Sequence, residues 1–193
     1  MTTAAAQKPL KPKLLKRGKM SARPLSITSD EHAAAVDFLN YEAELLDDLA
    51  ERTWLDECVS RDVVYQLPLR QTVERARGNG VVEGMFHLNE DHGSLSSKVK
   101  RNETAYAWAE DPPSRVRHFV TNIRVRHGSE PGTLAVRSNI LIYRTRQDQT
   151  TPQLLSGERH DELVEEGGQL RLRRRVTILD LTVIGTHNLS IFF

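Results

Sequence analysis

The sequence predicts an α+β fold in which N-terminal helices pack on a strongly curved, mixed but mainly antiparallel sheet. Apolar residues recur at helical spacing in residues 33–50, whereas the second half of the chain consists of long runs with strand character. In the last of these runs the apolar positions change parity, from Leu170 and Leu172 to Leu179 and Leu181. Such a change indicates a bulge, a sharp bend or burial on both faces, and a sheet curved around a long helix would produce it.

The composition is that of one soluble globular domain. Of the 193 residues 38% are hydrophobic and 27% are charged, which is enough chain and enough apolar material for a sizeable core. No apolar run approaches the ~18 residues of a membrane helix, and no apolar segment follows the basic start as in a secretory signal. The single cysteine, Cys58, excludes an internal disulfide and indicates a reducing, cytoplasmic setting.

Charge divides the chain into a flexible basic N-terminal arm, residues 1–27, and a domain, residues 28–193. The first 29 residues contain seven lysines and arginines and no acid, so the remainder is net acidic, because the whole chain carries only +1. The arm has three prolines and no periodic apolar face. It also lacks the aromatic residues that stack on bases, which favours a solvated arm, or a strap on a partner subunit, over binding to nucleic acid or membrane.

Helices are predicted at the start of the domain. Thr28 and Glu31 have the spacing of a capping box. A second, short helix over residues 53–59 buries Trp54, and a strand begins near Val63. The apolar face of the first helix consists of Val36, Leu39, Ala43, Leu46 and Leu49.

The middle of the chain predicts a loop and a further helix. The glycines of "RARGNGVVEG" are spaced wrongly for a phosphate-binding loop, so residues 75–84 are interpreted as a hairpin or loop. Residues 89–103 suit a short amphipathic helix, with Leu95 and Val99 on its apolar face. Strand-like runs then occupy residues 115–127, 133–147, 153–167 and 169–185.

A metal site is one candidate for chemistry. His87 and His92 have H-x4-H spacing with Glu90 and Asp91 between them, and two imidazoles with a carboxylate can bind mononuclear iron. No regular periodicity places both rings on one side, however, so a solvated loop is the preferred interpretation.

Acid–base catalysis in a cone-shaped pocket is the second candidate, because a buried histidine with a tyrosine or aspartate can act as a general base. His118 shares a strand face with Val116 and Val120, whereas Arg115 and Arg117 point to the other face. A core or interface histidine satisfied by hydrogen bonds is therefore favoured over a base. The possible partners are Tyr41, Tyr65 and Asp180.

Two further features indicate structural roles. In the triplet Arg173, Arg174 and Arg175 the middle residue faces opposite to the others, and any buried member needs an acid as partner. The triplet is interpreted as structural or interfacial. The terminal Phe192 and Phe193 require burial, either in this domain or against another subunit.

Four segments carry a family resemblance: "FLNYEAELLDD", "AWAEDPPSRVRHFVTNIRV", "VRSNILIYRTR" and "RRRVTILDLTVIGTHNLSIFF". They resemble the small (beta) subunit of bacterial Rieske-type aromatic-ring-hydroxylating dioxygenases, from about residue 30 to the end. The resemblance implies a cone-shaped fold like those of nuclear transport factor 2 and scytalone dehydratase. It also implies an α3β3 hexamer with beta–beta contacts, in which the alpha subunit carries a Rieske [2Fe–2S] cluster and a mononuclear Fe(II).

That enzyme adds both atoms of O2 to an aromatic ring and receives electrons from NADH through a reductase, often with a ferredoxin. The resemblance implies no cofactor, metal ligand or catalytic residue in this chain. A Rieske centre needs two cysteines, and the carboxylate that should precede His87 in an iron motif is replaced by Gly84. The sequence therefore predicts a non-catalytic assembly subunit. The alternative is a stand-alone lyase or isomerase that uses His118.

The "EDPPSR" stretch is interpreted as a corner that turns the chain into the sheet, because two prolines hold it extended. The residues expected to serve structure or subunit contacts are Arg115, Arg117, His118, Arg174, Phe192 and Phe193.

Overall fold

The computed structural model describes residues 23–103, 112–186 and 188–193. Within these ranges the chain forms the helices α1 (Asp30–Asp47), α2 (Glu51–Thr53) and α3 (His92–Asn102) and the strands β1 (Val59–Arg70), β2 (Val81–Glu90), β3 (Arg115–His127), β4 (Thr133–Thr145), β5 (Gln153–Glu166) and β6 (Gln169–Leu179). A π-helical turn (Trp54–Cys58) joins α2 to β1, and a 3-10 turn (Arg75–Arg77) lies between β1 and β2.

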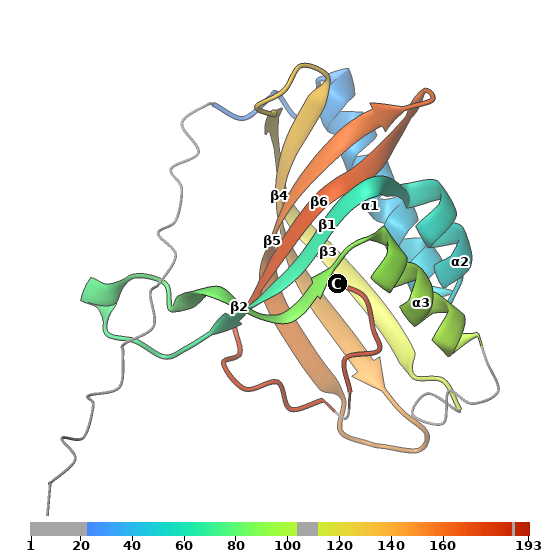
Figure 1. The fold of residues 1–193 in the computed structure, drawn as a ribbon, viewed down its shortest axis with the longest axis vertical. Coiled ribbons are helices and arrows are strands. Elements are labelled where there is room, and N and C mark those ends of the chain that lie inside the picture. The colour runs from blue at the N-terminus through green and yellow to red at the C-terminus, as the bar shows by residue number, and fades with distance from the viewer. Residues whose placement is uncertain (1–22, 104–111, 187) are drawn as a thin grey trace, which may run out of the picture.

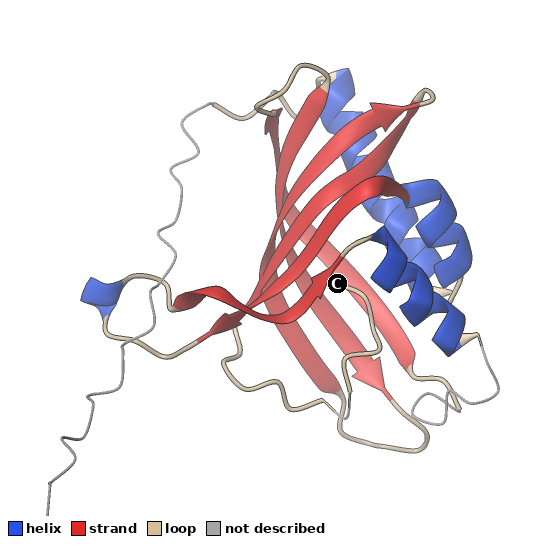
Figure 2. Ribbon diagram, viewed as in Figure 1, coloured by secondary structure: helices blue, strands red, loops and turns tan. Residues whose placement is uncertain are grey.

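The six strands form one sheet in the order β2-β1-β6-β5-β4-β3. The β1–β6 pair is parallel and the other pairs are antiparallel. The sheet curves, and α1, α2 and α3 lie together on one side of it (Figures 1 and 2). The predicted α+β class, with N-terminal helices on a curved, mixed and mainly antiparallel sheet, is confirmed. None of the helices in the described ranges is long and apolar enough to cross a membrane.

Helix α1 begins one residue later than the predicted capping box. Ser29, not Thr28, is the N-cap, and its hydroxyl accepts a hydrogen bond from the backbone N–H of His32 at 3.3 Å. Leu49 lies beyond the helix end at φ 59° and is exposed, so its predicted place on the buried face is wrong. The buried face consists of His32, Ala35, Phe38, Leu39, Glu42 and Leu46.

The second helical segment is confirmed, with Trp54 completely buried. It ends at Cys58, and β1 begins at Val59 rather than near Val63. The segment after β1 is a hairpin loop, as expected, and leads into β2. Gly80 is required there, because a Cβ atom on this residue would lie 2.1 Å from the carbonyl oxygen of Gln71.

Helix α3 confirms the short amphipathic helix. Asp91 is its N-cap and forms a capping box with Ser94, in which each side chain accepts a hydrogen bond from the other residue's backbone N–H. Leu95 and Val99 are buried against the core.

The parity change in the last run is a β-bulge. Across the β5–β6 pair Leu163 is opposite Leu172 and Glu162 is opposite Arg174, so Arg173 is the additional residue. Because of this additional residue, Arg175 faces the interior as Leu172 does, although the two are three positions apart. The strand ends at Leu179, so the predicted continuation to residue 185 is wrong, and Leu181 is exposed.

The predicted corner before β3 lies partly outside the described residues, since Glu110 and Asp111 are not described. The described part ends in Ser114, which is buried and accepts a hydrogen bond from Arg144 Nε at 3.0 Å. Arg144 Nη2 also donates to Asn188 Oδ1 at 3.0 Å. One buried guanidinium thus holds the end of the corner against the C-terminal segment.

The core consists of two apolar clusters. The larger joins α1, the π-helical turn, α3 and the neighbouring strands, and contains Phe192; the smaller contains Phe193 with Leu67, Ile140 and Ile142. The last residues of the chain therefore join the two clusters, and both terminal phenylalanines are buried in their own domain.

Candidate functional site

Four buried charged side chains lie between α1 and the sheet. This interior ion cluster consists of Glu42 on α1, Arg159 and Asp161 on β5, and Arg175 on β6. Arg175 is fully buried. Its Nη1 and Nη2 donate to Glu42 at 2.8 and 2.7 Å, and its Nε and Nη2 donate to Asp161, both at 2.8 Å. A fifth bond runs from Nη1 to the oxygen of Phe193 at 2.8 Å, so all five guanidinium N–H groups are used.

The charges in the cluster stabilise one another. Burial alone would raise the pKa of Glu42, but the neighbouring Arg175 and Arg159 hold it below its usual value. Burial and neighbouring charges also have opposite effects on Arg175. Burial lowers its pKa, but Asp161 and Glu42 raise that pKa well above the ordinary value. Burial and the like charge of Arg175 lower the pKa of Arg159. Because two acids face two guanidiniums, the cluster is formally neutral and suited to a structural role.

Aromatic residues enclose the cluster. Trp54 Nε1 donates to Glu42 Oε1 at 3.0 Å, and the Trp54 and Phe192 ring centroids lie 4.5 Å apart. The hydroxyl of Tyr65 donates to the oxygen of Phe193 at 2.8 Å and accepts from its N–H at 2.5 Å. Burial raises the pKa of Tyr65 to about 12, so this phenol stays protonated. The interior is therefore filled by the ion cluster and the C-terminal residues.

His118 is a satisfied structural histidine. Its ring is 3% exposed, Nδ1 lies 2.7 Å from Asp47 Oδ1, and Nε2 lies 3.1 Å from the carbonyl oxygen of Phe192. Each ring nitrogen thus has a partner within the domain. The imidazole thus connects the end of α1 to the C-terminal segment and presents no free nitrogen to a substrate.

The proposed acid–base group is not assembled. Tyr41 is 39% exposed on α1 and donates to Glu57 at 2.6 Å, whereas Tyr65 is buried against Phe193. Asp180 accepts from Arg70 and from Ser156 at the far end of β6. His118 and Tyr65 contact the two ends of the same Phe192–Phe193 peptide group, whereas Tyr41 and Asp180 have other partners. The four side chains therefore do not form one proton-transfer site.

The histidine pair does not form a metal site. His87 lies within β2 and His92 is the first residue of α3, while Asp91 between them is occupied as the helix cap. Across residues 23–103, 112–186 and 188–193, no group of three or more His, Cys, Asp or Glu side chains is placed to hold a metal ion. Burial raises the pKa of Cys58 to about 12, so this thiol is a poor ligand and a poor nucleophile.

Lys98 provides a pH-dependent contribution to stability. It is buried on α3, donates from Nζ to the carbonyl oxygen of Ile191 at 2.9 Å, and lies 4.5 Å from the Phe192 ring centroid. Burial lowers its pKa from 10.5 to about 8, against the opposing influence of Glu51. Between these values the unfolded chain binds more protons than the folded chain.

We therefore expect the free energy of unfolding to rise with pH through this interval by up to about 3 kcal/mol in excess of a Lys98→Met variant. Urea denaturation of both proteins between pH 7.5 and 10.5, values that bracket the interval defined by the folded and ordinary pKa, measures the difference. Parallel curves for the two proteins would contradict the assignment.

On the outer face of the sheet, opposite the helices, four exposed apolar side chains gather on β3, β4 and β5. In the strand register Phe119 is opposite Leu141, and Tyr143 is opposite Leu154. We name these four residues the apolar outer patch; their exposed fractions are 54%, 38%, 39% and 53% for Phe119, Leu141, Tyr143 and Leu154. Adjacent exposed apolar residues on one sheet face are typical of a contact surface.

Two of the predicted interface residues border this patch. Arg115 and Arg117 lie at every second position before Phe119 on β3, so all three side chains face the same way. Arg174 on β6 also faces outward, but it is opposite Glu162, eight residues along β5 from Leu154, and so lies away from the patch. Arg115 donates to the carbonyl oxygen of Gln147 at 2.6 Å, and Arg117 pairs with Asp47 at 3.4 Å while its side chain stays 63% exposed. Arg174 is exposed. The structure brings these residues to one face and separates them from His118, Phe192 and Phe193 inside.

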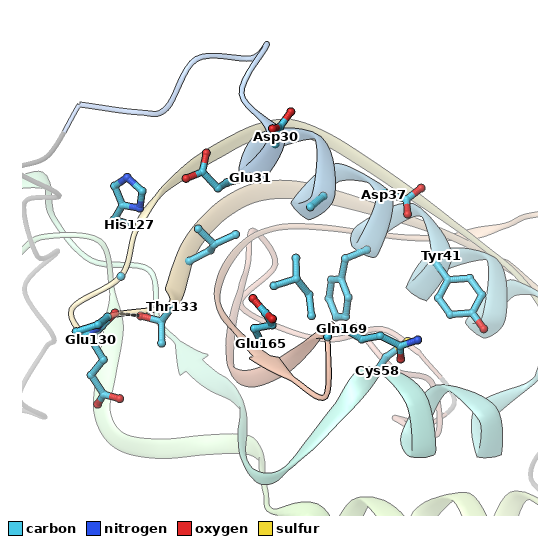
Figure 3. A pocket seen from close by; sticks show the side chains of 18 of the residues that line it. Asp30, Glu31, Asp37, Tyr41, Cys58, His127, Glu130, Thr133, Glu165 and Gln169 are labelled. Carbon is cyan, nitrogen blue, oxygen red and sulfur yellow. Dashed lines mark hydrogen bonds between the residues drawn. The ribbon is translucent and has the colours of Figure 1, made fainter.

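A groove lies where the first turns of α1 meet the β3–β4 and β5–β6 turns (Figure 3). Its volume is about 1040 Å3. Figure 3 shows Asp30, Glu31 and Asp37 along α1, with Glu130 on the β3–β4 turn and Glu165 near the end of β5. We call this feature the acidic groove.

Comparison with known proteins decides the family. A sequence profile of ring hydroxylating beta subunits matches residues 41–186, about three quarters of the chain. The chain belongs to the ring hydroxylating beta subunit family. This beta subunit is therefore a component of a ring-hydroxylating dioxygenase, as the resemblance predicts.

Solved structures agree with the family. A structure of naphthalene 1,2-dioxygenase with indole bound in its active site is 27% identical, with a TM-score of 0.76 over 86% of this chain and 89% of the matched chain. The beta subunit of benzoate 1,2-dioxygenase from Burkholderia mallei is 22% identical, with a TM-score of 0.62 over 77% and 89%. A predicted scytalone dehydratase from Novosphingobium aromaticivorans is 14% identical, with a TM-score of 0.59 over 82% and 89%. The expected cone-shaped, scytalone dehydratase-like fold is confirmed.

The donor atoms of this beta subunit do not fit a Rieske cluster. Such a cluster needs two cysteines and two histidines, and the sequence supplies only Cys58, which is buried in the core.

Sequence reasoning missed the interior ion cluster. Its available signal was Glu42, an acid in the middle of the apolar face of α1, three residues after Leu39 and four before Leu46.

Proposed function

We propose that this chain is the non-catalytic assembly subunit of a multicomponent, cytoplasmic dioxygenase. The complete enzyme uses NADH and O2 to cis-dihydroxylate an aromatic ring, and its alpha subunit carries the Rieske [2Fe–2S] cluster, the mononuclear Fe(II) and the chemistry. The complex is an α3β3 hexamer with beta–beta contacts, to which a ferredoxin and a reductase deliver electrons. Family membership supports the oxygenase assignment.

The observation that carries the assembly role is the apolar outer patch. A subunit buries apolar side chains either in its own core or at a contact, and this beta subunit has a separate core on the other side of the sheet. Aromatic residues flanked by arginines are the composition enriched in subunit contacts. Arg115 and Arg117 border the patch, and Arg174 lies farther along the same face; all three can face acids of a neighbouring subunit.

The interior favours assembly over the alternative lyase or isomerase. An acid–base enzyme of this fold needs a cavity with a base that can reach the substrate. Here His118 uses both ring nitrogens within the domain, and the C-terminal phenylalanines occupy the interior.

Native mass spectrometry of the tagged chain, recovered from its source cells, tests the proposal. We expect a heterohexamer with a larger, iron-bearing subunit. A monomer or homo-oligomer that turns over a substrate without iron would replace the proposal with the lyase or isomerase.

Variants of the outer face give a more specific prediction. We expect Phe119→Ala and Arg115→Ala each to lower the yield of hexamer about tenfold, because truncation of a central contact residue costs one to a few kcal/mol. The activity per iron in the surviving hexamers stays near the wild-type value. Size-exclusion chromatography with iron analysis measures both quantities.

The matched control is Arg61→Ala, which removes an exposed arginine of β1 outside the patch and leaves hexamer yield unchanged. Intact assembly of the Arg115→Ala variant with lost turnover would refute the structural role of this residue.

A further inference from the structure

The acidic groove has an uncompensated negative charge. Its described lining includes six carboxylates and neither lysine nor arginine. Two of them have partners, since Glu57 accepts from Tyr41 and Glu130 pairs with Arg173. The following four form no ion pair with another described residue: Asp30, Glu31, Asp37 and Glu165. Four solvent-facing carboxylates around one depression attract a cationic ligand.

The floor of the groove is apolar. Phe38 and Leu134 are largely buried beneath it, and Ala34, Cys58 and Leu170 complete the surface between the acids. The groove therefore suits a ligand that presents both cationic and apolar side chains. A lone metal ion or a small polar cation would leave the floor uncovered.

The N-terminal arm has this composition. Residues 8–19, "KPLKPKLLKRGK", contain six lysines and arginines, three leucines and no acid. The segment also contains two prolines, which are residues that disfavour an α-helix. The basic residues complement the rim, and Leu14 and Leu15 complement the floor.

The arm begins beside the groove. The backbone N–H of Leu25 donates to the carbonyl oxygen of Val125 at 2.9 Å, and its side chain packs against the core. Val125 is two residues before His127, which lines the groove. Only five residues lie between Lys19 and Leu25, so the six steps along the chain span at most about 20 Å. Such a short tether gives the arm a high effective concentration at the groove of its own chain.

We propose that the acidic groove binds residues 8–19 of the same chain. The arm then neutralises the carboxylates of α1 and covers Phe38. This inference is independent of the proposed assembly role.

Limited trypsin digestion of the full-length chain tests the charge contact, because trypsin cleaves after lysine and arginine. We expect cleavage after Lys13, Lys16 and Arg17 to be about tenfold faster in a Glu31→Lys/Asp37→Lys variant, because protection follows the bound fraction and each exposed charge contributes a fraction of a kcal/mol. High salt removes the difference.

The matched control is Glu44→Lys/Asp48→Lys. It reverses two exposed acids at the other end of the same helix segment, outside the groove, and leaves the cleavage rate at the wild-type value.

Disulfide trapping identifies which chain supplies the arm. In the full-length Leu14→Cys/Ala34→Cys variant we expect an intrachain disulfide, and no such bond when the second cysteine is placed at Asn139 on the outer face. A disulfide-linked dimer would assign the groove to the arm of another copy and overturn the same-chain assignment. Absence of any cross-link, together with equal cleavage rates, would overturn the groove as the binding site.

Discussion

The Arg175→Met variant is expected to lose about 3–5 kcal/mol of folding stability, because removal of one partner leaves buried charges uncompensated. Arg175 neutralises Glu42 and Asp161 and also binds the oxygen of Phe193. Methionine fills much of the volume but supplies none of the five donors. Arg159 cannot replace them, because its nearest contacts to Glu42 and Asp161 are 3.4 and 3.9 Å. Urea denaturation monitored by the fluorescence of Trp54 measures the loss.

The neighbouring Arg174→Met variant is the matched control for the isolated chain. Arg174 is exposed on the outer face, so its replacement should change stability by no more than about 0.5 kcal/mol. Adding Glu42→Gln to Arg175→Met should recover part of the loss, since it removes one of the uncompensated charges. Equal stability of the Arg174 and Arg175 variants would contradict the electrostatic role of the cluster.

The sequence predicts those parts of the fold that have a local signal. The helix at residues 33–50 and the long strands follow from spacings of a few residues, and a bulge is one of the interpretations of the parity change near Arg173. Element boundaries are less well determined. Thr28 and Ser29 can both cap a helix, and the capping-box spacing of Thr28 with Glu31 favoured Thr28, whereas Ser29 is the observed cap.

The interior ion cluster has no comparable local signal. Asp161 and Arg175 are direct partners across the β5–β6 pair, and Glu42 reaches them from α1, 133 positions away from Arg175. Such contacts depend on strand register and on how the helix lies across the sheet, which short-range periodicity does not determine. The same reason explains His118: its strand face was predicted, but its partners Asp47 and Phe192 come from opposite ends of the domain.

Phenylalanine serves two different roles on the two sides of the sheet. Phe193 is completely buried in the smaller apolar cluster, whereas Phe119 is 54% exposed in the apolar outer patch. We expect Phe193→Ala to destabilise the isolated chain by about 3–5 kcal/mol, through lost burial and the cavity left among Leu67, Ile140 and Ile142. Phe119→Ala should change the stability of the isolated chain by less than about 1 kcal/mol.

Phe193→Ala has the larger expected effect on folding stability, whereas Phe119→Ala has the larger expected effect on hexamer yield under conditions in which both variants are folded. Phe119→Ala lowers the hexamer yield although the isolated chain stays stable, because its ring is removed from a contact and not from the core. Phe193→Ala lowers the hexamer yield only because it unfolds the subunit. Its hexamer yield therefore recovers at temperatures where the variant is folded. Urea denaturation and size-exclusion chromatography of both proteins distinguish the roles. If Phe119→Ala proved as destabilised as Phe193→Ala, the outer patch would belong to the core and would no longer support a subunit contact.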